Sequence, residues 1–202
     1  MSSLFIPKII FRYAYPLDED RRRLFKSKNL GDFPDRKTVE VKAREWQIVW
    51  DEFNQEDKII RRMVELLGVS LSSYCEIYIF GNGLTPMSTP FIIPIMAEDG
   101  LRTNENLIGL VVHELSHKFA STEKSEKYWQ EINSKYKEEP VKTQNHIIVY
   151  AIIEIVLSEI FGKDRMRELI KANSPDYQKA IEIVDDVGPE DLIKEFRNLT
   201  NF

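Results

Sequence analysis

Two histidines and a glutamate stand in the sequence His113-Glu114-Leu115-Ser116-His117, in which the histidines are four positions apart. On a helix, residues four apart share one face with their Cβ atoms about 6 Å apart, so both imidazoles can bind one tetrahedral Zn²⁺ ion. Glu114 lies beside that face and can take a proton from a water that the metal activates, without binding the metal itself. The spacing therefore predicts a zinc site. A chance pattern at the surface, or a hydrogen-bonded cluster without metal, is the alternative.

A zinc ion with a catalytic role usually keeps three protein ligands. His146 is the one remaining histidine of the three in the chain, and it falls on an otherwise apolar stretch that we expect to be helical over residues 143–161. We therefore predict His146 as the third ligand, although it could also be a cap or a surface residue. Glu154 is the second candidate, because a carboxylate among apolar residues needs a partner, either the metal or a ligating histidine. The two side chains are about 12 Å apart along the helix, so one ion can bind only one of them.

The elements around the motif should position it inside the fold. The motif helix is expected to begin at Thr103 or Asn104, because either side chain can cap its first turn. Gly109 lies one turn before the motif, where it leaves room for a substrate or allows a close contact with another helix. A strand over Phe91–Met96 precedes the helix, and Pro94 predicts that this strand lies at an edge of its sheet, since proline cannot donate to a ladder.

The N-terminal part of the chain alternates between short strands and amphipathic helices. The expected elements are a strand within Lys8–Tyr15, a helix over Val39–Phe53 with Trp46 and Trp50 in the core, a second helix ended by Gly68, and a strand over Glu76–Phe80 followed by a turn at Gly81-Asn82-Gly83. The rest of residues 1–35 is expected to be irregular, with Arg21-Arg22-Arg23 in a charged turn.

The C-terminal part is expected to be helical. Residues 121–140 are predicted to form a charged surface connector that is partly helical, with a role as a lid as the alternative. Gly162 should end the helix over residues 143–161. Beyond it we expect two or three short helices, divided at Ser174-Pro175 and at Gly188-Pro189.

The composition is that of an ordinary soluble domain, with 202 residues, 43% hydrophobic and 30% charged. We expect one domain over residues 1–202, with its core at residues 72–160 and with residues 1–70 and 163–202 packed on it. The net charge of −5 argues against a nucleic-acid partner, which would need a cationic surface. A single cysteine, Cys75, fits a reducing compartment.

The sequence predicts neither a membrane span nor a signal peptide. The most apolar stretch, Ile147–Leu157, has about 11 residues, whereas a spanning helix needs about 20. The first residues have no long apolar run and no small-residue cleavage site. We therefore expect a cytoplasmic protein without a membrane partner.

The motif and its surroundings, over about residues 72–160, resemble the zincin metallopeptidases. In the gluzincin branch the third ligand is the glutamate of an Asn-Glu-x-x-x-Asp helix, and the comparable stretch here reads Asn145-His146-Ile147-Ile148-Val149-Tyr150. A histidine thus replaces the glutamate, and a tyrosine replaces the aspartate. The metzincin pattern is absent, because Ala120 and Glu123 stand where it has a glycine and a third histidine. The small minigluzincin-like proteins of archaea are the nearest comparison.

The resemblance implies a zincin-like α+β fold. In it, a small mixed or antiparallel sheet packs on the motif helix and on a second helix that carries a ligand, with extra helices at both ends of the chain. It also implies that the strand Phe91–Met96 lines the cleft and pairs with an extended peptide.

These residues together predict a zinc-dependent peptidase that acts on a peptide or protein substrate, with His113, His117 and His146 as metal ligands. Glu114 is expected to act as the general base. Tyr150, one turn from His146, either donates a hydrogen bond to the developing oxyanion or only packs. Two other functions stay open: a non-catalytic module that binds zinc or a partner, and a metal-dependent hydrolase of another bond.

Overall fold

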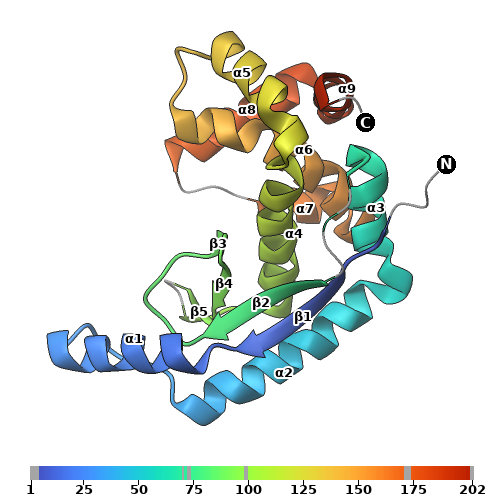
Figure 1. The fold of residues 1–202 in the computed structure, drawn as a ribbon. Helices are drawn as coiled ribbons and strands as arrows, with labels where there is room; N and C mark the ends of the chain where they lie inside the picture. Colours follow the sequence, from blue (N-terminus) through green and yellow to red (C-terminus); the bar gives the residue numbers. More distant parts are fainter. Residues whose placement is uncertain (1–4, 70, 72–73, 98–99, 171–173, 201–202) are drawn as a thin grey trace.

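The structure, a computed structural model, describes residues 5–69, 71, 74–97, 100–170 and 174–200 (Figure 1). Its strands are β1 (Lys8–Tyr13), β2 (Tyr74–Phe80), β3 (Met87–Ser88), β4 (Phe91–Pro94), β5 (Met96–Ala97) and β6 (Gly100–Leu101). Its helices are α1 (Tyr15–Lys28), α2 (Arg36–Phe53), α3 (Lys58–Leu67), α4 (Asn104–Ala120), α5 (Glu126–Lys135), α6 (Val141–Phe161), α7 (Lys163–Leu169), α8 (Pro175–Val187) and α9 (Pro189–Thr200). The expected α+β class is confirmed.

The main sheet has the order β1-β2-β4-β3 and is mixed. Strands β1, β2 and β4 run parallel, whereas β3 pairs antiparallel with β4. The outer edge of β1 is partly closed by Gln47 of α2, which accepts a hydrogen bond from the Phe11 amide at 2.8 Å and donates one to the Ile9 carbonyl at 3.3 Å. The opposite edge of the sheet is the short strand β3, which contacts α4.

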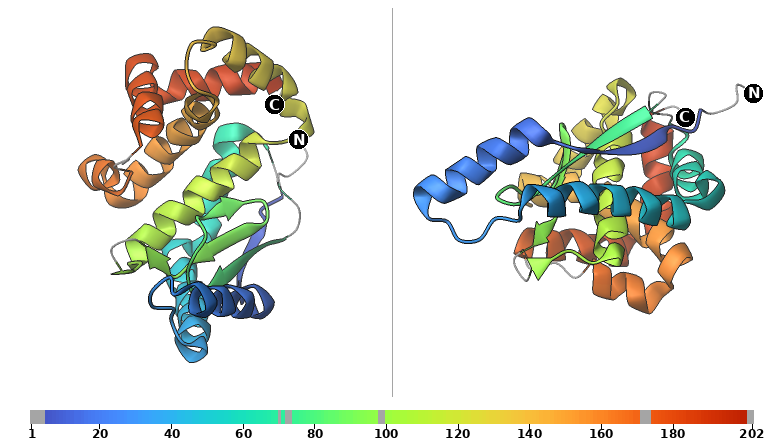
Figure 2. Two further views of the ribbon diagram at one scale, coloured as in Figure 1. Left: turned by 90° about the vertical axis from the view of Figure 1, so that its left-hand side faces the viewer. Right: turned by 90° about the horizontal axis from the view of Figure 1, so that it is seen from below.

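The helices form two groups around this sheet. α2 and α4 pack against the sheet and against one another. α6 packs against α4 on one side and against α7, α8 and α9 on the other. Figure 2 shows, in its left view, the helices α5–α9 gathered beyond α4, with the sheet on the other side of α4. α4 and α6 thus face each other where the two groups meet.

A continuous hydrophobic core joins the two groups, with members from Ile9 to Phe196. Trp46 and Trp50 are 0% and 1% exposed, which confirms that the tryptophans of α2 are core residues. In β2 the buried side chains alternate along the strand, as its sequence predicts. The apolar helix α6 is long enough to cross a membrane by length and composition, but 72% of its apolar window is buried inside the structure.

Several predicted boundaries are confirmed. Thr103 caps α4 by accepting a hydrogen bond from the Asn106 amide at 3.1 Å. Gly68 ends α3 in the left-handed region, with φ of 69°, which glycine adopts without a steric penalty. Gly162 follows the last residue of α6. The described residues after Gly162 form three helices, which are separated near the two predicted breaks.

The prediction that residues 1–35 are irregular apart from one strand was wrong, because residues 15–28 form α1. Arg21, Arg22 and Arg23 lie in this helix and not in a turn. Pro16 stands in its first turn, where proline is compatible with a helix. Only Asp18 and Phe25 of α1 are buried, so the sequence has no apolar stripe to reveal the helix. Figure 1 shows α1 projecting away from the rest of the molecule.

The prediction that the strand over Phe91–Met96 lies at an edge was also wrong. β4 has β2 on one side and β3 on the other, and it ends at Pro94. β3 pairs only with Phe91 and Ile92, so Pro94 lies beyond that pairing and its missing N–H breaks no bond of the β3 ladder. Met96 belongs to a separate two-stranded hairpin, β5–β6.

Residues 121–140 are more ordered than a surface connector. They contain a 3-10 turn over Glu123–Ser125 and the helix α5. Tyr128 and Ile132 are fully buried, and the ring of Tyr128 lies 4.9 Å from that of Phe196 in α9. This segment therefore packs into the C-terminal helices.

Candidate metal centre

Helix α4 presents two imidazoles on one face. His113 and His117 are one turn apart, and their ring centroids are 5.0 Å apart. The Nε2 atoms of the two rings are separated by 3.3 Å. Both nitrogens therefore point toward the same position beside the helix.

Helix α6 brings the third imidazole to the same position. The Nε2 atom of His146 lies 3.2 Å from that of His117. The Nδ1 atom of His146 is 2.7 Å from the carbonyl oxygen of Lys142. Because a carbonyl only accepts, this Nδ1 carries the proton, and Nε2 of the neutral ring keeps its lone pair for a metal ion.

The spacing of the three rings fits a metal ion. Four ligands at about 2.0–2.1 Å from a tetrahedral zinc are about 3.3–3.4 Å apart, close to the observed 3.3 and 3.2 Å. A cluster held by hydrogen bonds alone explains the geometry less well, because one N–H of His117 can donate to only one of its two neighbours. One ring nitrogen from each of His113, His117 and His146 lies within 4.8 Å of the others, so one ion can bind all three.

Within the described part of the chain, no fourth histidine, cysteine or carboxylate joins this group. Glu154, the alternative ligand, is 7% exposed and lies apart from it. Its Oε1 atom accepts a hydrogen bond from Arg167 at 3.2 Å and is 3.8 Å from the ammonium of Lys163. The partner that a buried carboxylate needs is thus supplied by α7. Three histidines alone would leave one position of a tetrahedral ion open.

Burial keeps the three imidazoles neutral, which is the form that binds metals. Loss of hydration lowers the pKa of His117 to about 4, with the nearby His146 ring as the second cause. The same loss lowers the pKa of His113 well below its usual value, and it lowers the pKa of His146 as well. At neutral pH no proton has to leave these rings before a metal ion binds.

Glu114 is a buried carboxylate without a fixed partner. It is 6% exposed, and no described residue donates a hydrogen bond to it. Desolvation raises its pKa to about 7. It lines a pocket of about 470 Å³ together with His113, so the carboxylate faces space that a substrate and a water molecule can fill. These are the properties of a general base that works near neutral pH.

Two tyrosines cover the imidazoles. The ring of Tyr150, one turn along α6 from His146, lies 5.9 Å from that of His113 and 6.0 Å from that of His146. The ring of Tyr177, near the start of α8, lies closer to His146, at 4.5 Å. Both tyrosines line the same pocket as Glu114. No feature of the sequence pointed to Tyr177, because its position depends on how α8 packs against α6.

Gly109 forms part of the wall of this pocket. A Cβ atom added to it would meet only Leu157, at 4.0 Å, which is an ordinary contact. Close packing of the helices therefore does not require a glycine here. Of the two explanations drawn from the sequence, space in the pocket fits the structure better than helix packing.

Comparison of the chain with known protein families, with curated proteins and with solved structures gave no match. The functional argument therefore depends on the site itself.

Proposed function

We propose that the protein is a zinc-dependent metallopeptidase that hydrolyses peptide bonds in a peptide or protein substrate. The observation that carries the proposal is the convergence of three neutral imidazoles beside an unpartnered carboxylate, at the wall of an open pocket. Three histidines with one free position are a ligand set of catalytic zinc sites, whereas structural zinc sites have four protein ligands.

His113, His117 and His146 would hold a zinc ion, which would supply a Lewis acid that polarises a carbonyl group and lowers the pKa of a water molecule toward about 7. Glu114 accepts the proton of the attacking water on its carboxylate. It then delivers that proton to the amide nitrogen as the carbon–nitrogen bond breaks, so the amine leaves neutral. Tyr150 and Tyr177 line the same pocket as Glu114. The hydroxyl of either tyrosine can donate a hydrogen bond to the developing oxyanion there.

The pocket and the sheet edge indicate how a peptide would be held. Beside Glu114 the pocket is lined by Leu110, Ile153 and Ile170, which suit an aliphatic side chain. The edge strand next to α4 is β3. We assign to Met87–Ser88 the peptide pairing that the resemblance to zincins implies for Phe91–Met96. Because β3 has only two residues, the ladder with a peptide would be short.

A non-catalytic metal-binding module is the alternative function. It explains the three histidines, but it gives no reason for a buried carboxylate that has no hydrogen-bond partner. A carboxylate with a role in packing alone is expected to be paired, as Glu154 is with Arg167.

The test is the Glu114→Gln variant, with Glu131→Gln on the exposed face of α5 as its control. Both variants and the parent protein are loaded with zinc, and their metal content and hydrolysis of a peptide library are measured. We expect all three to hold one zinc ion, and Glu114→Gln to lose at least about 100-fold in rate. If Glu114→Gln cleaves peptides as fast as its control, the proposed mechanism is wrong.

A further inference from the structure

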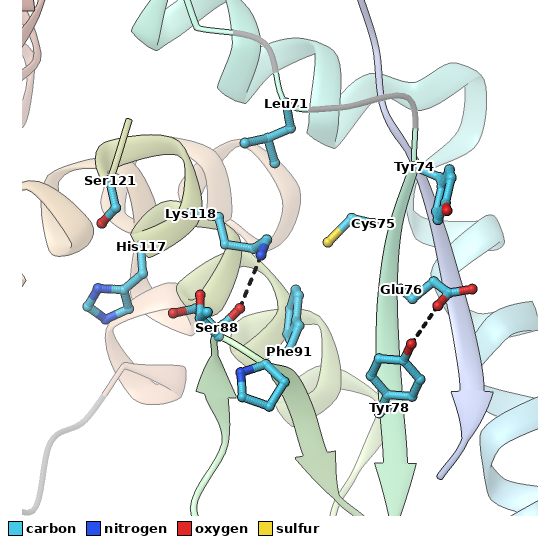
Figure 3. A pocket seen from close by; sticks show the side chains of 12 residues that line it. Leu71, Tyr74, Cys75, Glu76, Tyr78, Ser88, Phe91, His117, Lys118 and Ser121 are labelled. Atoms are coloured by element: carbon cyan, nitrogen blue, oxygen red, sulfur yellow. Dashed lines mark hydrogen bonds between the residues drawn. The ribbon is translucent and has the colours of Figure 1, made fainter. Parts of the chain in front are cut away.

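A second pocket opens on the other side of the histidine cluster, beside His117 (Figure 3). It has a volume of about 500 Å³. Its walls come from β2, from residues 88–91 and from the C-terminal end of α4. His117 belongs both to the cluster and to this wall, although its ring points away from Lys118 and Cys75 in Figure 3. The pocket therefore adjoins the turn of α4 that carries His117.

Lys118 places an ammonium group in this pocket. Its Nζ atom donates a hydrogen bond to the carbonyl oxygen of Ser88 in the edge strand β3, at 3.2 Å, as Figure 3 shows. An ammonium has three donors, so two remain for a ligand. Among the residues that the structure describes, no carboxylate forms an ion pair with Lys118.

The other charged group in the pocket, Glu76, is already compensated. Its carboxylate forms an ion pair with Arg12 and accepts a hydrogen bond from the hydroxyl of Tyr78 at 2.6 Å. The uncompensated charge in the pocket is therefore the positive charge of Lys118.

We propose that this pocket binds a carboxylate of the substrate, with Lys118 as the residue that determines this specificity. The inference rests on the proposed peptidase function and adds the substrate class: peptides with an acidic side chain, or with their terminal carboxylate, close to the scissile bond. Lys118 follows His117 directly in α4, and its ammonium contacts β3, so its charge lies beside the proposed peptide-pairing edge and one residue away from a proposed metal ligand. An acidic group of the substrate in this pocket would neutralise the charge of Lys118.

Binding can be measured without turnover in the zinc-loaded Glu114→Gln protein, by fluorescence anisotropy with labelled peptides. The peptides differ only in Glu against Gln at successive positions, and in a free against an amidated C-terminus. We expect one acidic peptide to bind about tenfold more tightly than its neutral partner. The position of that Glu, or the effect of amidation, identifies the source of the carboxylate.

The same preference is then measured in variants at Lys118. We expect Lys118→Met to abolish it, Lys118→Glu to reverse it, and Lys118→Arg to keep it, while Lys127→Met on α5 changes nothing. The inference is overturned if the Glu114→Gln protein with Lys118 intact binds acidic and neutral peptides equally well. It is also overturned if Lys118→Met leaves the preference for acidic peptides unchanged. Hydrolysis by the parent protein, in which Glu114 is intact, is measured separately. If the parent cleaves no peptide, the proposed peptidase function is wrong. The binding preference of the Glu114→Gln protein still shows whether the pocket recognises carboxylates.

Discussion

The buried carboxylate of Glu114 should give the metal-free protein an unusual dependence of stability on pH. The pKa of Glu114 is raised to about 7 in the folded state, whereas the unfolded chain has an ordinary value of about 4.3. Between about pH 4.3 and pH 7, Glu114 binds a proton in the folded protein but not in the unfolded chain. Its contribution to stability is therefore present at low pH and is lost as the pH rises through about 7.

The histidines act in the opposite direction. The pKa of His117 is lowered to about 4 by burial, so its ring binds a proton on unfolding between about pH 4 and pH 6.5. Stability from His117 is present above pH 6.5 and is lost as the pH falls. His113 and His146 have lowered pKa values too, so they add losses of the same sign.

The contributions of Glu114 and His117 to the pH dependence of stability can be compared in size. When the pH falls from 7.5 to 5.5, linkage gives a loss of stability of about 1.3 kcal/mol from His117 and a gain of about 1.9 kcal/mol from Glu114. Glu114→Gln removes only the gain. We therefore expect this variant to lose about 2 kcal/mol more than the parent protein over the same change in pH.

The assay is urea unfolding at pH 7.5 and pH 5.5, in the presence of a chelator, followed by tryptophan fluorescence. Glu131→Gln, a substitution at an exposed glutamate of α5, is the control and should behave as the parent does. Equal pH dependence in the parent and in Glu114→Gln would refute the reasoning, because it would mean that the Glu114 carboxyl titrates normally.

Three further predictions concern the residues around the site. His146→Ala should weaken metal binding strongly in a titration with zinc, whereas Glu154→Gln should leave it unchanged and only lower the urea midpoint, because Arg167 loses its buried partner. Gly109→Ala should raise the free energy of unfolding by about 0.5–1 kcal/mol, since the added methyl meets only an ordinary contact; a lower stability would show that the helices need the glycine. Tyr128→Phe should be neutral or stabilising in thermal unfolding, because the buried Tyr128 hydroxyl has no partner in the structure; a marked loss of stability would reveal a missing partner.

The histidine cluster was largely predictable because most of its geometry is local. His113 and His117 lie one turn apart on one helix, so their convergence follows from helix geometry alone. His146 was found by elimination in a chain with three histidines. The choice between His146 and Glu154 required tertiary structure, since it depends on which turn of α6 faces α4.

The residues that line the pockets were not predictable in the same way. Tyr177 comes from α8 and Lys118 faces β3, and both contacts depend on packing between elements that are distant in sequence. The hydrophobic periodicity of a single element does not predict which distant element it contacts.

The errors in the fold have a similar cause. The helix α1 buries few side chains, so an apolar pattern is absent. α5 buries Tyr128 against Phe196, a partner 68 positions later, and its charged sequence resembles a surface segment. The position of β4 inside the sheet depends on the two-residue strand β3, which is too short to show alternation.

The most direct test of the metal centre is X-ray absorption at the zinc edge on the zinc-loaded protein, with the metal content measured on the same sample. The account predicts one ion per chain, bound by three imidazole nitrogens and one oxygen from solvent at about 2.0 Å. A protein that holds no zinc, or one whose zinc is enclosed by four side chains, would contradict it.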